Sequence, residues 1–207
     1  MSGAVYIHHP VVVVLAAGSS SRLGRPKQLL EYRGKTLLAH AVEAAMESVA
    51  NKVVVVLGAN EREVRRALPT GSFDVLVNDG WGEGMASSVR LAMQHLQQNQ
   101  PGADGALLVV CDQPFVSANL FDQMLQMQHN TGRPIVACSY AERLGTPALF
   151  HRSYFDLLAQ LKGDTGARKI LQEHSTQVAA VPFEQGINDI DTPEAYQQLL
   201  TTQGLSQ

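Results

Sequence analysis

Three loops of this sequence carry the residue types that phosphate and metal chemistry uses. The first is LAAGSSSRLGRPK, residues 15–27, in which small residues are followed by Arg22 and Lys27. Small residues let the backbone approach a ligand closely, and consecutive N–H groups can form an anion-binding nest. The planar fork of Arg22 can hold two phosphate oxygens, whereas Lys27 supplies a point charge. The loop is therefore typical of a polyphosphate-binding site. The alternative interpretation is an exposed turn whose cations are solvated.

Two familiar nucleotide-binding motifs do not match the sequence. Five residues separate Gly18 from Gly24, and no Ser or Thr follows Lys27, so the loop is not a GxxxxGK[ST] P-loop. The GxGxxG dinucleotide fingerprint is also absent. This second absence argues against a redox enzyme of the dinucleotide-binding type.

The second loop is CDQP, residues 111–114, directly after an apolar run. Asp112 offers a carboxylate at the end of a predicted parallel strand, and Mg²⁺ favours one or two carboxylates together with substrate phosphates. Capping of the helix that starts near Ser117 is the alternative role of Asp112. Cys111 is predicted to be a buried strand residue, because no histidine that could activate it is near in the sequence.

The third loop is NDGWGEGMASSV, residues 78–89, with alternating glycines before a predicted helix. Such glycines can expose backbone groups to a planar base, and the hydroxyls of Ser87 and Ser88 can add hydrogen bonds. The alternative interpretation of this segment is a helix N-terminus that is capped by serine after a turn.

Two further segments place charged residues before helices. In NDIDTPEAY, residues 188–196, Asp189 and Asp191 precede a strong helix start, and either can be a second metal ligand, with Asp189 favoured. In GDTGAR, residues 163–168, a loop enters a helix. A surface turn with a helix cap, without any ligand, explains this segment equally well.

Alternating strand and helix patterns must position these loops. Apolar β-branched runs at 11–15, 52–58, 73–78, 105–112 and 134–140 alternate with helical periodicity at 36–49, 61–68, 84–97 and 117–128. This pattern predicts an α/β fold with a mostly parallel central sheet and helices on both faces. After residue 140 the pattern loosens through AERLGTPALF, two short helical stretches and QVAAVPF to a final helix from about Pro193. Ligands in such sheets bind beyond the carboxyl ends of the strands, where the three loops fall.

Length and composition set the remaining limits. The 207 residues, 45% of them hydrophobic and 17% charged, predict one domain over residues 1–207 with a core of about 11–200. A net charge of -3 gives no global attraction to nucleic acid or to an anionic membrane. The two cysteines have neither metal-ligand nor disulfide spacing, which favours the cytoplasm. No apolar run approaches the roughly 18 residues that span a bilayer.

Taken together, LAAGSSSRLGRPKQLL, CDQP, GMASSVRLAM, GDTGAR and NDIDTPEAY resemble the molybdopterin nucleotidyltransferase family over about residues 11–200. LAAG followed by CDQP is most similar to the molybdenum cofactor cytidylyltransferases, whereas the guanylyl branch typically has LAGG and DMP. The resemblance implies a Rossmann-like nucleotide-diphospho-sugar transferase fold. It also implies Mg²⁺-dependent transfer of CMP from CTP to the terminal phosphate of the molybdenum-molybdopterin cofactor, with release of pyrophosphate.

The resemblance further implies a role for each candidate residue. The expected nucleotide-binding residues are Leu15, Ala16, Ala17, Gly18, Arg22, Lys27, Asn78, Gly80 and Ser88. The expected catalytic residues are Arg22, Lys27 and Asp112, and the expected metal ligands are Asp112 and Asp189. The expected acceptor-side residues are Gly163, Asp164, Arg168 and Asp191, with GTP at 145–147 lining the same side.

Several alternatives stay open on sequence grounds. One alternative is that the nucleotide is GTP. Another is that the acceptor is a different compound, such as a sugar phosphate. From a different class, a nucleotide-binding cofactor chaperone would bind nucleotide without releasing pyrophosphate, although Arg22, Lys27 and Asp112 count against it. A molybdenum enzyme or its chaperone is a compatible protein partner, but no sequence feature identifies one or sets the oligomeric state.

Overall fold

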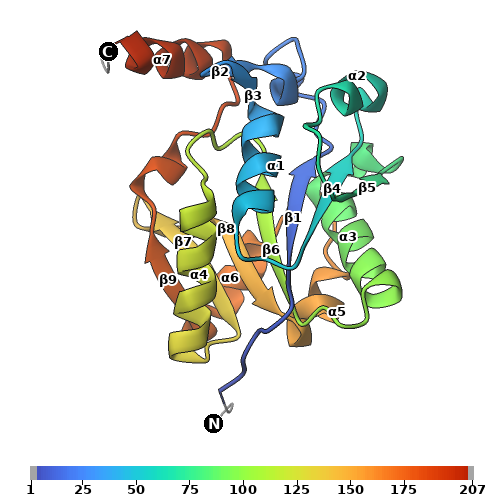
Figure 1. Ribbon diagram of the computed structural model, residues 1–207, viewed down its shortest axis with the longest axis vertical. Helices are drawn as coiled ribbons and strands as arrows, with labels where there is room; N and C mark the ends of the chain where they lie inside the picture. The colour runs from blue at the N-terminus through green and yellow to red at the C-terminus, as the bar shows by residue number, and fades with distance from the viewer. Residues whose placement is uncertain (1–3, 205–207) are drawn as a thin grey trace.

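The valine run near the N-terminus forms β1 (Pro10–Ala16), in which every residue is buried. The computed structural model describes residues 4–204, so residues 1–3 and 205–207 of the predicted domain lie outside the described residues. Alternate side chains of β1 enter two different hydrophobic clusters, Val12 and Val14 in one and Val11 and Val13 in the other. A strand buried on both faces needs covering layers on both sides, and Figure 1 shows helices on both faces of the sheet.

Seven strands form the central sheet, in the order β5-β4-β1-β6-β8-β7-β9. Its other members are β4 (Lys52–Leu57), β5 (Asp74–Val77), β6 (Gly105–Val110), β7 (Ile135–Tyr140), β8 (Arg143–His151) and β9 (Val178–Pro182). β8 runs antiparallel to both of its neighbours, and all other pairs are parallel. The predicted mostly parallel α/β sheet is therefore confirmed.

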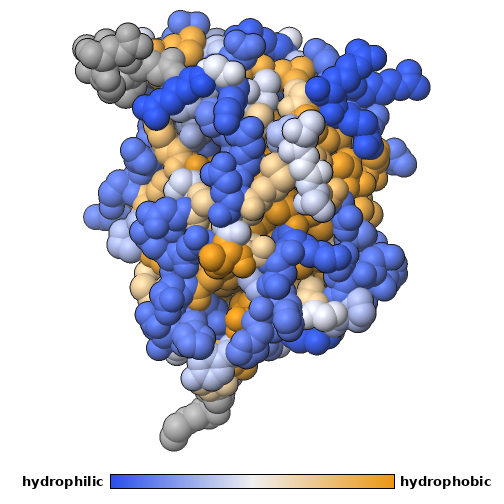
Figure 2. Space-filling model, viewed as in Figure 1, coloured by the Kyte–Doolittle hydropathy of each residue, from blue (hydrophilic) through white to orange (hydrophobic). Residues whose placement is uncertain are grey.

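The helices divide between the two faces of the sheet. One cluster joins α1 (Leu37–Glu47), α2 (Glu61–Arg66) and α4 (Ala118–Thr131), and the other joins α3 (Met85–Asn99), α5 (Phe155–Leu158) and α6 (Arg168–Glu173). Short 3-10 helices complete the connections: η1 (Lys27–Leu29), η2 (Trp81–Glu83), η3 (Arg152–Tyr154), η4 (Ser175–Gln177) and η5 (Glu184–Ile187). The face seen in Figure 2 is largely hydrophilic, with hydrophobic patches between the elements. Within residues 4–204, no helix combines the length and apolar character that crossing a membrane requires.

The segment AERLGTPALF differs most from expectation, because most of it lies in the strand β8. Its pairing with β7 jumps from Ala137–Ala148 to Cys138–Gly145, which leaves Thr146 and Pro147 in an irregularity of the ladder. Proline is tolerated in a sheet at such bulges, and here it interrupts the alternation that signals a strand.

The C-terminal helix α7 (Pro193–Gly204) returns to the start of the chain. It packs on the small hairpin of β2 (Glu31–Tyr32) and β3 (Lys35–Thr36), as Figure 1 shows at the top of the molecule. A third hydrophobic cluster holds this contact, and the Tyr196 hydroxyl donates to the carbonyl of Glu31 at 2.8 Å. The segment that carries Asp189 and Asp191 is thereby brought beside the first loop.

Candidate active site

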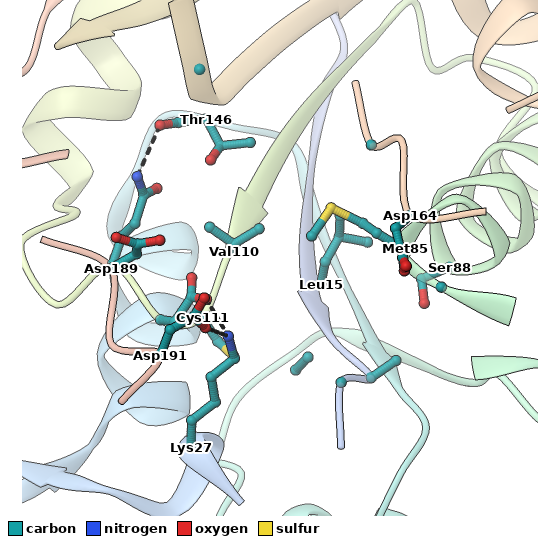
Figure 3. A pocket seen from close by; sticks show the side chains of 18 of the residues that line it. Leu15, Lys27, Met85, Ser88, Val110, Cys111, Thr146, Asp164, Asp189 and Asp191 are labelled. Carbon is teal, nitrogen blue, oxygen red and sulfur yellow. Dashed lines mark hydrogen bonds and ion pairs between the residues drawn. The ribbon is translucent and has the colours of Figure 1, made fainter. Parts of the chain in front are cut away.

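The carboxyl ends of β1 and β6 open onto a cavity of about 780 Å³. Six segments line it: the loop after β1, the loop before α3, the end of β6, the β7–β8 hairpin, the loop before α6 and the segment before α7. The structure therefore brings all of the predicted loops together. Figure 3 shows Lys27, Asp189 and Asp191 on one side of the strand ends, with Met85, Ser88 and Asp164 on the other.

Most of the expected residues line this cavity. They are Leu15, Ala16, Ala17, Gly18, Arg22, Lys27, Ser88, Asp112, Asp164, Arg168, Asp189 and Asp191. Of the expected segment 145–147, Gly145 and Thr146 line it and Pro147 does not. Asn78, Gly80 and Gly163 do not line it either.

A buried glutamine, which the sequence analysis missed, fixes the loop after β1. Gln28 is fully buried, and its Nε2 donates to the carbonyls of Ala16 and Gly18 at 2.8 Å each. The backbone N–H of Lys27 donates to the Ser20 hydroxyl at 2.9 Å. No local sequence signal identifies Gln28, because it lies among the polar and apolar residues of KQLLEY and its burial depends on the fold.

Lys27 lies between two carboxylates from distant parts of the chain. Its Nζ donates to Asp191 at 2.8 Å (Figure 3) and also to Asp112. Asp191 accepts a further bond from Arg22 at 2.7 Å. Burial alone lowers the pKa of Lys27, but the charge of Asp112 and the hydrogen bonds from Lys27 to Asp112 and Asp191 raise it above its usual range. Lys27 is therefore a charged side chain in a half-buried site.

The second carboxylate-bearing segment is anchored directly to the first. The backbone N–H of Ile190 donates to the carbonyl of Asp112 at 3.0 Å. Gln113 adds two bonds, from its Nε2 to the carbonyls of Gly186 at 3.0 Å and Thr146 at 3.1 Å. Gln113 is thus a positioning residue that the sequence analysis did not single out.

Two carboxylates in the cavity have the character of metal ligands. Asp112 Oδ1 is buried and has no hydrogen-bond partner among the described residues. Burial, followed by the charges of Asp112 and Asp191, raises the pKa of Asp189. A divalent cation would relieve both conditions, because hard oxygen donors with uncompensated charge suit it. Residues 4–204 contain no group of three or more His, Cys, Asp or Glu arranged to hold a metal ion.

Helix capping does not explain Asp112. The helix after it, α4, is capped by Ser117, whose hydroxyl accepts from the backbone N–H of Leu120 at 3.3 Å. Cys111 is buried as predicted, and burial raises its pKa to about 12, so it is a protonated thiol near neutral pH.

Asn78 and Gly80 shape the wall rather than line it. The Asn78 amide nitrogen donates to Ser87 at 2.8 Å and Ser88 at 2.9 Å, and its oxygen accepts from the N–H of Gly80 at 3.0 Å. Both amide hydrogens of Asn78 thus hold the loop onto α3, and its expected role in nucleotide binding stays a prediction. Gly84 stands at the N-cap of α3 without a side-chain bond, so the serine-cap alternative is wrong.

Gly58, directly after β4, is a third missed residue. A Cβ atom there would lie 2.7 Å from Ala17 Cβ and 2.8 Å from Trp81 Cβ, which is closer than real Cβ atoms approach their neighbours. The loop after β1 and the loop before α3 can meet here only because position 58 has no side chain.

The loop before α6 is attached to the loop before α3. The carbonyl of Gly163 accepts from the N–H of Ala86 at 3.0 Å, so Gly163 anchors this loop, and its expected acceptor-side role stays a prediction. Arg90 joins Glu83 through two bonds of 2.7 and 2.6 Å and also donates to the Leu161 carbonyl at 2.9 Å. The N-cap of α6 makes no side-chain bond, so a helix cap does not account for the GDTGAR segment.

A model of the MobA-like NTP transferase domain matches residues 12–178. The chain belongs to this family. It is accordingly a nucleotidyltransferase, and solved nucleotidyltransferases share its Rossmann-like fold.

Individual relatives of this MobA-like protein have diverse names. The nicotine blue oxidoreductase of Paenarthrobacter nicotinovorans is 32% identical over 202 residues, which cover 91% of this chain and 95% of that protein. A molybdenum cofactor guanylyltransferase of Sinorhizobium fredii is 36% identical over 108 residues, 52% of this chain and 48% of that protein. The crystal structure of Rv0371c from Mycobacterium tuberculosis has 34% identity and a TM-score of 0.81, covering 94% of this chain and 99% of that one. Rv0371c has also been solved in complex with manganese, at 29% identity and a TM-score of 0.78 over 94% of this chain and 100% of that one.

Proposed function

We propose that the protein transfers CMP from CTP to the terminal phosphate of a molybdopterin-type acceptor and releases pyrophosphate. The observation that carries the proposal is the pairing of Lys27 and Arg22 with carboxylates in one cavity, beside the unpartnered oxygen of Asp112. Cations that can leave carboxylates for phosphates, next to free carboxylate oxygens, suit a nucleoside triphosphate bound with a divalent metal.

In this proposal the loop after β1 holds the triphosphate. Backbone N–H groups of residues 16–18 bind phosphate oxygens, and Arg22 and Lys27 stabilise the negative charge that grows on the departing pyrophosphate. Asp112 and Asp189 hold Mg²⁺, which would supply further positive charge to the triphosphate. No general base is required, because a phosphate monoester is already largely ionised near neutral pH. Alignment and charge stabilisation supply the catalysis.

More specific observations support the proposed nucleotide base and the proposed acceptor. LAAG and CDQP, with Ala17 and Gln113, support CTP by resemblance, and Ser88 lines the cavity where the cytosine is proposed to lie. Asp164, Arg168, Gly145 and Thr146 line it on the proposed acceptor side. The relative named as a guanylyltransferase makes GTP the competing nucleotide.

Two further proposals concern the domain organisation and the cellular location of the protein. We infer that the whole chain is one domain, because a single sheet runs through the described residues and α7 packs back on the first hairpin. A cytoplasmic location is supported by Cys111 and Cys138, which are both free and buried.

Release of pyrophosphate with each of CTP, GTP, ATP and UTP tests the proposal directly. The reaction contains Mg²⁺ and molybdenum-loaded molybdopterin, and Asp112→Asn serves as the inactive comparison. Release that requires the acceptor and is fastest with CTP supports the proposal, whereas fastest release with GTP moves the protein to the guanylyl branch. Binding of NAD(P)H without any nucleotide transfer would assign a redox role like the one that the oxidoreductase relative's name states.

A further inference from the structure

Four arginine and lysine side chains line the cavity, and two of them have no carboxylate partner. Arg22 and Lys27 pair with aspartates, whereas no ion pair joins Arg143 or Arg168 to a carboxylate within residues 4–204. Arg168 is already a proposed acceptor-side residue. Arg143 is the first residue of β8 and is not among the residues expected from the sequence.

The exposed Arg143 side chain lies over an aromatic ring. Its guanidinium carbon lies 5.7 Å from the centre of the Tyr140 ring, and the two residues face each other across the β7–β8 hairpin. A guanidinium that stacks on a ring keeps its N–H donors free at its edge. The contact with Tyr140 therefore uses none of the hydrogen bonds that Arg143 would need to bind a ligand.

The Tyr140 ring is itself fixed in a narrow slot. It is 9% exposed, and a Cβ atom on Gly186 would lie 2.7 Å from its Cε1. The Tyr140 hydroxyl lies 3.5 Å from Nε2 of Gln113, the neighbour of Asp112. The ring thus runs from the hairpin towards the proposed metal ligand, and Arg143 lies over it.

The hairpin that presents this pair is strained. Ala141 and Glu142 form its two-residue turn with φ of 47° and 58°. Such tight hairpin turns require left-handed residues, and glycine or asparagine adopts that conformation far more readily than alanine or glutamate. Strain of this kind collects at functional sites, where it fixes a geometry.

The proposed reaction requires a positively charged group beside the acceptor phosphate. The acceptor phosphate must approach the triphosphate of CTP, and both groups are negative. Arg22 and Lys27 are committed to the triphosphate and its carboxylates, so a second anion needs positive charge of its own. We propose that Arg143 binds the phosphate of the acceptor, an inference that rests on the proposed function.

A double perturbation tests this contact, one in the protein and one in the ligand. Equilibrium dialysis measures the binding of molybdopterin and of its dephosphorylated form, with a CTP analogue whose α–β bridge cannot be cleaved. The proteins are the wild type, Arg143→Ala and Arg152→Ala. Arg152 is a matched control because it is an exposed arginine just beyond the other end of β8 and does not line the cavity.

Arg143→Ala is expected to weaken molybdopterin binding roughly ten- to a hundredfold, as loss of a hydrogen bond to a charged group does. Binding of the dephosphorylated form should stay within about threefold, because the two changes remove the same contact. Arg143→Lys should be intermediate, since it keeps the charge but loses the fork. Arg152→Ala should alter neither ligand, and Arg143→Ala should leave the CTP affinity, measured by calorimetry, unchanged.

The failures can be told apart. Equal weakening for both ligand forms, or no weakening, overturns the role of Arg143 while wild-type transfer upholds the proposed function. A lower CTP affinity in Arg143→Ala assigns the side chain to the nucleotide and also overturns the role. If the wild type binds neither form, the proposed acceptor is wrong and the inference falls with it.

Discussion

At the scale of single residues, Lys27 joins the two halves of the site. Its ammonium group contacts Asp112, just after β6, and Asp191, before α7, so one cation pairs with carboxylates from the middle and from the C-terminal part of the chain. Incoming phosphates would compete for that cation, which leaves the carboxylates available to a metal ion.

Replacement of Lys27 by alanine should lower kcat by about 100-fold or more, because a preorganised charge on the departing pyrophosphate is lost. Steady-state pyrophosphate release measures this effect. Lys35→Ala is the control, since Lys35 is an exposed lysine paired with Glu43 outside the cavity. Near-normal turnover of a folded Lys27→Ala protein would remove Lys27 from the catalytic group.

The two thiols provide a test of burial at residue scale. Burial raises the pKa of Cys111 and of Cys138 to about 12, so both remain protonated from pH 6 to pH 9. Because the thiolate is the reactive form, the native protein should react with a disulfide reagent far more slowly at pH 8 than the unfolded protein. Rapid labelling of native Cys111 would mean that the end of β6 is open to solvent.

At the scale of elements, the strand-to-helix loops function because neighbouring elements approach each other closely. Gly58 follows β4 at the point where the loop after β1 meets Trp81, and the N–H of Ala59 donates to the carbonyl of Ala17 at 3.0 Å. Gln28 ties down the same loop from η1. The phosphate loop is therefore held from two elements outside its own sequence.

Gly58→Ala should displace this loop and weaken nucleotide binding by roughly tenfold, with a loss of stability of about 1–3 kcal/mol from overpacking. Calorimetric titration and thermal unfolding measure the two effects. Gly102→Ala is the matched control, because a Cβ atom there meets nothing within 4 Å. Equal behaviour of the two variants would show that the contact at position 58 does not shape the site.

Sequence periodicity predicted the parallel strands because they are continuous apolar runs, as in β1 and β4. It did not predict β8, whose alternation is interrupted at Thr146 and Pro147. The sequence motifs identified Lys27, Asp112 and Asp191 as candidate site residues. Their ion pairs depend on how α7 packs, which no local sequence pattern predicts. Gly58, Gln28 and Arg143 were missed because their roles arise only from contacts between distant segments.

At the scale of the whole molecule, one sheet links the loops that carry the site. Because the C-terminal segment contributes Asp189 and Asp191, the cavity is complete only when both ends of the chain are folded. Binding and folding should therefore be coupled throughout the protein.

Calorimetry should show a single unfolding transition for the chain, with calorimetric and van't Hoff enthalpies that agree. CTP with Mg²⁺ at about 100 times its Kd should stabilise the fold by about 2.7 kcal/mol and raise Tm by roughly 5–10 °C. The same ligands should have little effect on Asp112→Asn. Two separate transitions would contradict the proposed single domain.

The central claim is the transfer of CMP to a phosphorylated pterin, and a competition experiment tests it most directly. Equimolar CTP and GTP are incubated with the protein, Mg²⁺ and molybdenum-loaded molybdopterin, and the pterin product is identified by mass spectrometry. We predict a product that is predominantly the cytidine dinucleotide form of the cofactor, formed together with one pyrophosphate per molecule. A predominantly guanine product, or an unmodified pterin while either nucleotide is consumed, would contradict the account.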